Sequence, residues 1–220
     1  MPTITSVEPQ QHDPERVSVF VDGVFAFGVT LMLAYARDLS VGRELSDDEI
    51  ESIQRDDEVD RAFSAALNFL SFRPRSSREM RDYLRRRKLE PEVVDAALGR
   101  LERAGLLDDS EFARFWVENR QSFRPRGTRA LKAELRLKGL ETDVIEGALE
   151  NLGDEEETAY RAGLKKADSL RNADERDFFT RMLGFLQRRG FPYAAAAPAS
   201  RRLFATIHDA EPEEIDLTDR

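Results

Sequence analysis

The chain has 220 residues, of which 40% are hydrophobic and 35% are charged, and it contains no cysteine. This length suits two or more small modules, and the absence of cysteine excludes disulfides and thiolate metal sites. No run approaches the roughly 18 apolar residues that a membrane span requires, and the first residues lack the pattern of a secretory signal. We therefore expect a cytoplasmic protein that does not associate with membranes.

The net charge of −9 is distributed unevenly along the chain. Residues 1–60 carry a net charge of −10, residues 66–138 carry +7, and residues 139–220 carry −7. A basic middle between acidic ends indicates contact with a polyanion or an acidic surface through the middle of the chain. Solvated helix faces would give the same pattern, so charge alone leaves both interpretations open.

Residues 1–57 predict a small module that contains β-structure. Alternating runs at residues 17–21 and 24–28 flank Asp22-Gly23, a dipeptide typical of a two-residue hairpin turn. Residues 3–7 are a candidate third strand.

Two short helices are expected to complete this module, over residues 29–36 and 47–57. Ser46 and Glu49 have the spacing of a capping box at the start of the second helix.

A separate helical segment is expected from about residue 58, where apolar residues recur at i, i+3 and i+4. This helix should end before Pro74, because the residue before a proline avoids the helical region. Ser76 and Glu79 predict a capped second helix. Pro91 lies in the first turn of a third helix that ends near Gly105.

The same layout returns 51 residues later in the chain. Phe72-Arg73-Pro74-Arg75 reappears as Phe123-Arg124-Pro125-Arg126. Leu84 corresponds to Leu135, and a further shift of 51 leads to Leu186. The sequence therefore predicts three copies of a three-helix unit, of which the third is divergent.

We expect a mainly α-helical fold of tandem, helix-turn-helix-like three-helix repeats in an elongated arrangement. The predicted segments are a β-hairpin and helix module at 1–57, repeats at 58–107, 108–152 and 153–206, and an acidic tail at 207–220. Pro198 falls inside the last helix of the third repeat and should bend or shorten it.

The sequence offers little for catalysis. Its two histidines, His12 and His208, lie near the ends of the chain, and it has no Gly-rich phosphate loop and no nucleophile motif. The acidic run at residues 154–157 is interpreted as a first helical turn, favourable against the helix dipole. We therefore expect no enzyme activity, no metal site and no cofactor.

Basic side chains on the second helix of each of the first two repeats form a candidate binding site. Arg78, Arg81 and Arg85 share one stripe of a helix. The second repeat has Arg129, Lys132 and Arg136 at the same positions, whereas the third has Thr180, Leu183 and Gln187.

The Arg-Pro-Arg corners add Arg73, Arg75, Arg124 and Arg126 to this predicted site. Guanidinium groups suit phosphates and carboxylates, so we expect these ten residues to bind a polyanion or an acidic surface. The alternative is that they pair with local acids such as Glu79, Asp82 and Glu134.

Several apolar residues have the spacing of buried helix faces and are expected in the core. They are Phe72, Met80, Tyr83, Leu84, Phe123, Leu131 and Leu135. Trp116 lies on a helix with Phe112 and Phe115 whose apolar face is wide. It is either a core residue or an exposed contact for a partner.

Four segments resemble the RecX family, regulators of the bacterial recombinase RecA. They are residues 66–76, which include Phe72-Arg73-Pro74-Arg75, residues 101–109, residues 112–118, and residues 123–127, which include Arg124-Pro125-Arg126. The resemblance covers roughly residues 60–152. The module at 1–57 also looks like an extension that some members carry at the amino terminus.

The resemblance implies a helical, elongated and curved protein that lodges in the groove of the RecA–DNA filament. It further implies suppression of RecA ATPase and strand exchange, with direct DNA binding by some members. The residues that match the family's motif, and are therefore expected to bind RecA or DNA, are Arg73, Arg75, Arg124 and Arg126; the repeat pattern adds the neighbouring basic stripe. We therefore expect a monomeric regulator of RecA filaments in DNA repair and recombination. The alternatives are a protein that binds single- or double-stranded DNA independently of RecA, and an adaptor whose hairpin module docks an unrelated partner.

Overall fold

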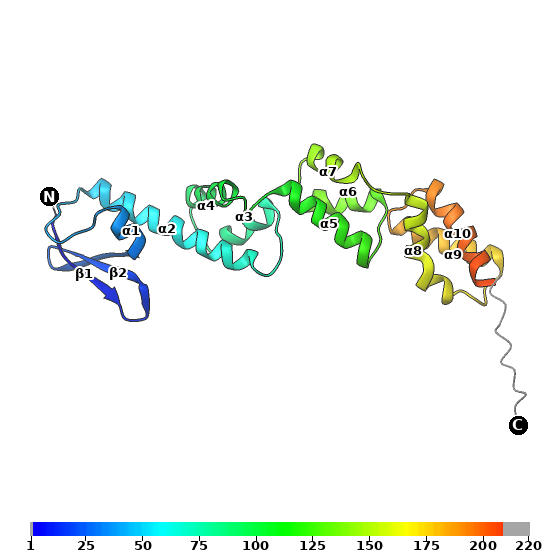
Figure 1. Ribbon diagram of the computed structural model, residues 1–220, viewed down its shortest axis with the longest axis horizontal. Coiled ribbons are helices and arrows are strands. Elements are labelled where there is room, and N and C mark those ends of the chain that lie inside the picture. Colours follow the sequence, from blue (N-terminus) through cyan, green and yellow to red (C-terminus); the bar gives the residue numbers. More distant parts are fainter. Residues whose placement is uncertain (1, 209–220) are drawn as a thin grey trace, which may run out of the picture. The chain divides into compact units, whose positions relative to one another are not determined.

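The computed structural model describes residues 2–208. The chain divides into two compact units, Met1–Leu107 and Asp108–Arg220. The first contains a small sheet and four helices, and the second contains six helices within the described residues (Figure 1). The acidic tail predicted at 207–220 lies outside the described residues from position 209 onward.

A three-stranded antiparallel sheet opens the first unit, with strands β1 (Ile4–Gln10), β2 (Asp13–Val21) and β3 (Val24–Thr30) in that order. Asp22 and Gly23, with φ angles of 50° and 81°, form the predicted turn. Both angles are positive, as the hairpin requires. The predicted hairpin and the candidate third strand are both confirmed.

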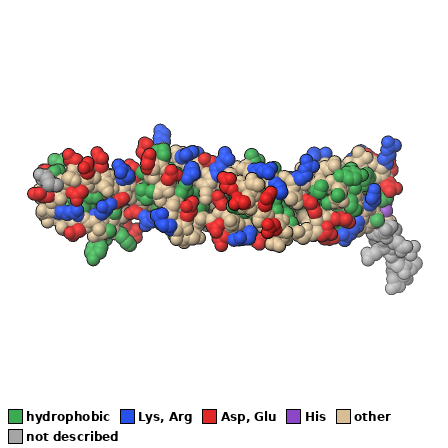
Figure 2. Space-filling view, turned by 90° about the horizontal axis from the view of Figure 1, so that it is seen from above, with side chains coloured by type: hydrophobic (Ala, Val, Ile, Leu, Met, Phe, Trp, Pro, Cys, Tyr) green, Lys and Arg blue, Asp and Glu red, His purple; other side chains and the backbone are tan. Residues whose placement is uncertain are grey.

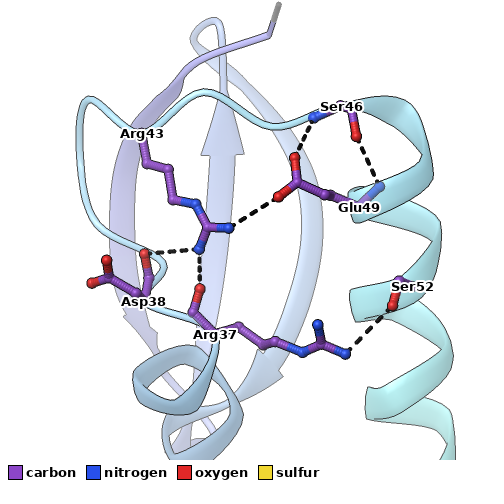
Figure 3. Close-up of polar contacts among 6 residues, drawn as sticks. All are labelled: Arg37, Asp38, Arg43, Ser46, Glu49 and Ser52. Carbon is purple, nitrogen blue, oxygen red and sulfur yellow. Dashed lines mark hydrogen bonds and ion pairs between the residues drawn. The ribbon is translucent and has the colours of Figure 1, made fainter.

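A loop after α1 (Leu31–Ala36) is tied to the start of α2 (Asp47–Leu70) by one arginine. Arg43 donates to the backbone carbonyls of Arg37 and Asp38 and to Glu49 (Figure 3). Glu49 and Ser46 form the predicted capping box. The hydrogen bond from the Ser46 backbone N–H lowers the pKa of the Glu49 carboxyl.

Helix α2 is continuous across the predicted boundary at residue 57. The expectation of one helix at 47–57 and another from 58 was therefore wrong. The charged stretch at 55–58 contains neither glycine nor proline, so nothing local interrupts the helix. Ile53 packs in the sheet core, whereas Ala62 and Ala66 pack in the core of the first repeat. The two parts of this unit thus share one helix.

A buried ion pair joins the sheet to α2. Asp57 is only 5% exposed, and both of its oxygens accept from Arg16 Nη2, at 2.9 and 2.8 Å. The same nitrogen donates to the carbonyl of Gly28 on β3. Arg61 contacts Asp57 from the exposed side at 2.9 Å.

Three three-helix repeats make up the rest of the fold. The first combines α2 with α3 (Ser77–Arg85) and α4 (Pro91–Arg103). The second comprises α5 (Asp109–Phe123), α6 (Thr128–Leu137) and α7 (Thr142–Leu149), and the third comprises α8 (Glu155–Asp168), α9 (Glu175–Arg188) and α10 (Tyr193–His208).

The spacing of 51 residues is preserved in the cores of these repeats. Two positions on each middle helix are fully buried, at 0% exposure: Met80, Leu131 and Met182 at the first, and Leu84, Leu135 and Leu186 at the second. The three-copy prediction is confirmed at the level of packing.

Phe72 and Phe123 are not core residues, contrary to the sequence prediction. Each is 78% exposed. Helix α2 ends at Leu70 and α5 ends at Phe123 itself, so both rings lie where the apolar stripe of the helix stops. Tyr83, also expected in the core, is half-buried and stacks on Phe69 with 4.0 Å between ring centroids.

Pro198 does not shorten the last helix, since α10 continues to His208. The expectation of a shorter helix was wrong because packing outweighs the one backbone hydrogen bond that the proline nitrogen cannot donate. Ala196 and Ala199 are fully buried in the core of the third repeat. Helix α8 approaches α10 so closely that a Cβ at Gly163 would lie 2.3 Å from Leu203 Cδ1.

Two glycines form a close contact between the second and third repeats. The Gly127 N–H donates to the Arg189 carbonyl at 3.1 Å, and a Cβ at Gly127 would lie 2.4 Å from the Gly190 backbone. Gly190 has a φ of 88°, and a Cβ there would lie 2.4 Å from Ala130 Cβ. Only glycine fits at either position without moving the backbone.

The first prediction concerns the buried ion pair. Asp57→Ala should lower the free energy of unfolding by about 3–5 kcal/mol, because Arg16 would remain buried without its partner. Arg61→Ala, which removes an exposed partner of the same carboxylate, should cost less than about 1 kcal/mol. Urea unfolding followed by circular dichroism measures both, and equal losses would contradict the assignment.

The second prediction concerns the glycine contact. Gly127→Ala should destabilise the second unit by about 1–3 kcal/mol, because the new methyl group would overlap the Gly190 backbone. Gly147→Ala is the matched control, since nothing lies within 4 Å of a Cβ at that helical position. It should stabilise the protein by about 0.5–1 kcal/mol. The same unfolding assay applies, and a neutral Gly127→Ala would rule out close packing there.

Candidate functional site

Four arginines of the predicted stripe are exposed on two middle helices. Arg78 and Arg85 lie on α3, and Arg129 and Arg136 lie on α6. Among residues 2–208, none of the four forms an ion pair. Their guanidinium groups therefore keep their charge available for an external anion.

The central residue of each stripe forms an ion pair with the last helix of its own repeat and so braces the two helices against each other. Arg81 contacts Asp95 on α4 at 2.9 Å, and Lys132 contacts Glu146 on α7 at 4.0 Å. Both pairs are related by the 51-residue shift. The third repeat has Leu183 and Ala197 at these positions, and both pack in its core. For these two residues the alternative of local pairing holds, although with acids other than those proposed from the sequence.

The two arginines of the first corner, defined as residues 72–75, both contact groups of their own repeat. Arg73 donates to both carboxylate oxygens of Glu79, at 3.1 and 3.0 Å. Arg75 lies over the ring of Phe69, 3.8 Å from its centroid. Burial, together with the charge of Arg73, lowers the pKa of Arg75.

The second corner, defined as residues 123–126, has a different charge environment. Arg124 is exposed and, within the described part of the chain, forms no ion pair. Arg126 Nε lies 3.6 Å from Glu134 Oε1, which is too long for a hydrogen bond. Glu134 Oε2 already accepts from Arg120 Nε at 2.7 Å and from Trp116 Nε1 at 2.9 Å. One carboxylate is therefore shared among several donors.

Trp116 is half-buried and enclosed by its own repeat. Its ring lies 5.8 Å from that of Phe112, between centroids. The guanidinium of Arg120 and the ammonium of Lys138 lie over it, at 4.4 and 4.8 Å. Trp116 therefore packs within its repeat and donates a hydrogen bond to Glu134. This agrees better with the prediction of a core residue than with that of an exposed contact.

Arg189 is a residue at this site that sequence reasoning missed. It comes from the third repeat, and its Nη1 donates to the Pro125 carbonyl at 3.4 Å. Burial, followed by the charges of Arg126 and Arg124, lowers the pKa of Arg189. The repeat alignment matched residues 186–191 to 135–140, but no spacing linked Arg189 to a corner 64 residues earlier.

The structure thus divides the ten predicted residues into three groups. Arg78, Arg85, Arg124, Arg129 and Arg136 are exposed without an ion pair among the described residues. Arg81 and Lys132 are braces, whereas Arg73, Arg75 and Arg126 contact groups of their own repeats. On the face drawn in Figure 2, basic side chains lie among acidic ones rather than in one uniform patch.

The part of the chain that the structure describes holds no group of three or more potential metal-ligating His, Asp or Glu side chains. None of its helices has the combination of length and hydrophobicity that crossing a membrane requires.

Family models match the sheet module and a large part of each three-helix repeat. The model of the regulatory protein RecX N-terminal domain matches residues 2–46. Models of the first, second and third three-helix domains of RecX match residues 62–101, 108–149 and 154–197.

Curated relatives and solved structures are similar over comparable lengths. The regulatory protein RecX of Bacillus subtilis (strain 168) is 33% identical over 222 residues, covering 99% of this chain and 83% of the relative. That of Listeria monocytogenes serovar 1/2a is 30% identical, covering 96% and 80%. A crystal structure of regulatory protein RecX has a TM-score of 0.75 at 26% identity, covering 95% of this chain and 100% of that one.

RecX from Lactobacillus salivarius shares the fold, with a TM-score of 0.59 at 23% identity over 67% of this chain and 97% of that one. The four matched domains, the relatives at 30–33% identity and the repeated three-helix cores agree with one another. The chain therefore belongs to the RecX family of regulatory proteins.

Proposed function

We propose that this protein binds RecA filaments and inhibits RecA ATP hydrolysis and recombination, without catalysing a reaction of its own. Membership of a family of regulatory proteins supports a regulatory role. The observation that carries the proposal further is the duplicated set of exposed arginines. The same two positions of the middle helix bear an exposed arginine in the first and second repeats, but not in the third.

The five exposed arginines suit a partner that is both protein and polyanion. A RecA filament presents DNA phosphates together with protein carboxylates, and guanidinium groups recognise either. Because these side chains form no ion pair with any described residue, binding would cost little beyond the ordering of the side chains themselves. The acidic character of the chain, with a net charge of −9, would oppose indiscriminate binding to DNA.

The second candidate function is DNA binding independent of RecA. The same exposed arginines favour it, since they would contact phosphates directly. It predicts an affinity that falls steeply with salt, by about one log-log slope unit for each phosphate contact. Binding to DNA without any effect on RecA would favour this second function.

The third prediction tests the exposed arginines in RecA-catalysed ATP hydrolysis driven by single-stranded DNA, with RecA from the same organism. Arg129→Gln/Arg136→Gln should raise the concentration for half-inhibition by about 3- to 10-fold, which corresponds to roughly 0.7–1.4 kcal/mol. The matched control is Lys165→Gln/Arg176→Gln, which removes from the third repeat two exposed charges that form no ion pair among the described residues.

Equal effects of the two double variants would refute the site assignment. If the wild-type protein left RecA unchanged, the proposed function would itself fail. Inhibition at substoichiometric amounts would indicate capping or disassembly of filaments rather than one-to-one blocking.

A further inference from the structure

The two Phe-Arg-Pro-Arg corners have the same sequence, but the charged residues around them differ. Glu79, which neutralises Arg73 in the first corner, corresponds by the 51-residue shift to Ala130. Ser76, the residue that caps α3, corresponds to Gly127. The second corner therefore lacks the acid that holds its counterpart in the first.

The contact with the third repeat accounts for both differences. Gly127 lies against the Gly190 backbone, and the Cβ of Ala130 would lie 2.4 Å from a Cβ placed on Gly190. A hydroxymethyl group at 127 would overlap the chain at Gly190, and the close approach favours a small side chain at 130. Packing between repeats thus replaces a capping serine and a neutralising glutamate with glycine and alanine.

The same contact adds a positive charge to the second corner. Arg189, adjacent to Gly190, donates to the Pro125 carbonyl, and Pro125 lies between Arg124 and Arg126 in the chain. Three guanidinium groups thus converge on one turn. Among residues 2–208, the ion pair that these three arginines form is the 3.6 Å contact between Arg126 and Glu134, whose carboxylate also binds Arg120 and Trp116.

The second corner also presents a group that can stack on a planar ligand. The Phe123 ring, next to Arg124, is largely exposed. An exposed aromatic ring beside arginines is the arrangement that single-stranded nucleic acids recognise, with bases stacked on the ring and phosphates on the cations.

We propose that the second corner binds single-stranded DNA, with Arg124, Arg126 and Arg189 on backbone phosphates and Phe123 stacked on an unpaired base. The first corner, where Glu79 pairs with Arg73, is not an equivalent site. This inference rests on the proposed function, which supplies the DNA strand, and it names the residues that contact that strand. An acidic protein surface would satisfy the arginines but would offer Phe123 no planar partner.

The fourth prediction compares matched charge changes at the two corners. Arg189→Gln should weaken binding of a fluorescent oligothymidylate by about 3- to 10-fold at low salt and reduce the salt slope by about 0.7, the value for one lost phosphate contact on a single strand. Arg73→Gln should change the affinity less than about twofold. Fluorescence anisotropy across a series of KCl concentrations measures both variants.

Arg124→Gln, an exposed residue whose loss leaves no buried partner, serves as a second variant in case Arg189→Gln perturbs folding. It should show the same loss of affinity and of salt slope. Circular dichroism and thermal melting establish that each variant is folded. Equal weakening by Arg73→Gln and Arg189→Gln, or no binding by the wild-type protein at low salt, would overturn the inference.

The fifth prediction isolates the aromatic contact. Phe123→Ala should weaken binding of oligothymidylate about fivefold or more, because stacking of a base on an aromatic side chain is worth about 1–3 kcal/mol. It should leave unchanged the affinity for an abasic oligonucleotide of the same length, which keeps the phosphates but has no base to stack. Phe72→Ala is the matched control, since that ring is equally exposed at the first corner.

A parallel RecA ATPase assay separates this inference from the proposed function. Variants that lose DNA affinity but still inhibit RecA would support the DNA site and place the RecA contact elsewhere. Variants that lose inhibition while binding oligothymidylate normally would overturn the inference and assign the corner to protein carboxylates. An equal loss with the abasic oligonucleotide would remove Phe123 from the site.

Discussion

The helical part of this protein depends on the burial of two apolar positions on the middle helix of each repeat. Met80, Leu131 and Met182, with Leu84, Leu135 and Leu186, are completely buried at a constant spacing. A segment of about 50 residues buries a small share of its surface and is only marginally stable alone, so each repeat gains stability from a neighbour. The first repeat shares α2 with the sheet, and the second contacts the third through Gly127 and Gly190.

These two ways of joining segments have different chemical consequences. Along α2, a continuous helix carries Ile53 into one core and Ala66 into the next, and the pair Arg16–Asp57 sets the sheet against it. Between the second and third repeats, backbone approaches backbone, which selects the smallest residues. Because of that steric requirement, the second corner has Ala130 where the first corner has the carboxylate of Glu79. A packing constraint thereby creates an electrostatic difference between two copies of one motif.

The basic residues of this chain illustrate how a single sequence pattern serves several purposes. Arg81 and Lys132 brace their repeats, Arg73 is held by Glu79, and Arg78 and Arg85 face solvent. All of them belong to the same two motifs in sequence. Divergence in the third repeat follows the same logic, since Leu183 and Ala197 replace the ion pair with apolar packing.

The sequence by itself determined the features that depend on near neighbours or on a constant period. These include the turn at Asp22-Gly23, the caps of α2 and α3, the 51-residue repeat and the family resemblance. The tertiary structure alone decided the continuity of α2, the exposure of Phe72 and Phe123, and the approach of Arg189 to Pro125. Burial and ion pairing depend on residues that are distant in the chain, and no local spacing encodes which of two similar arginines will meet an acid.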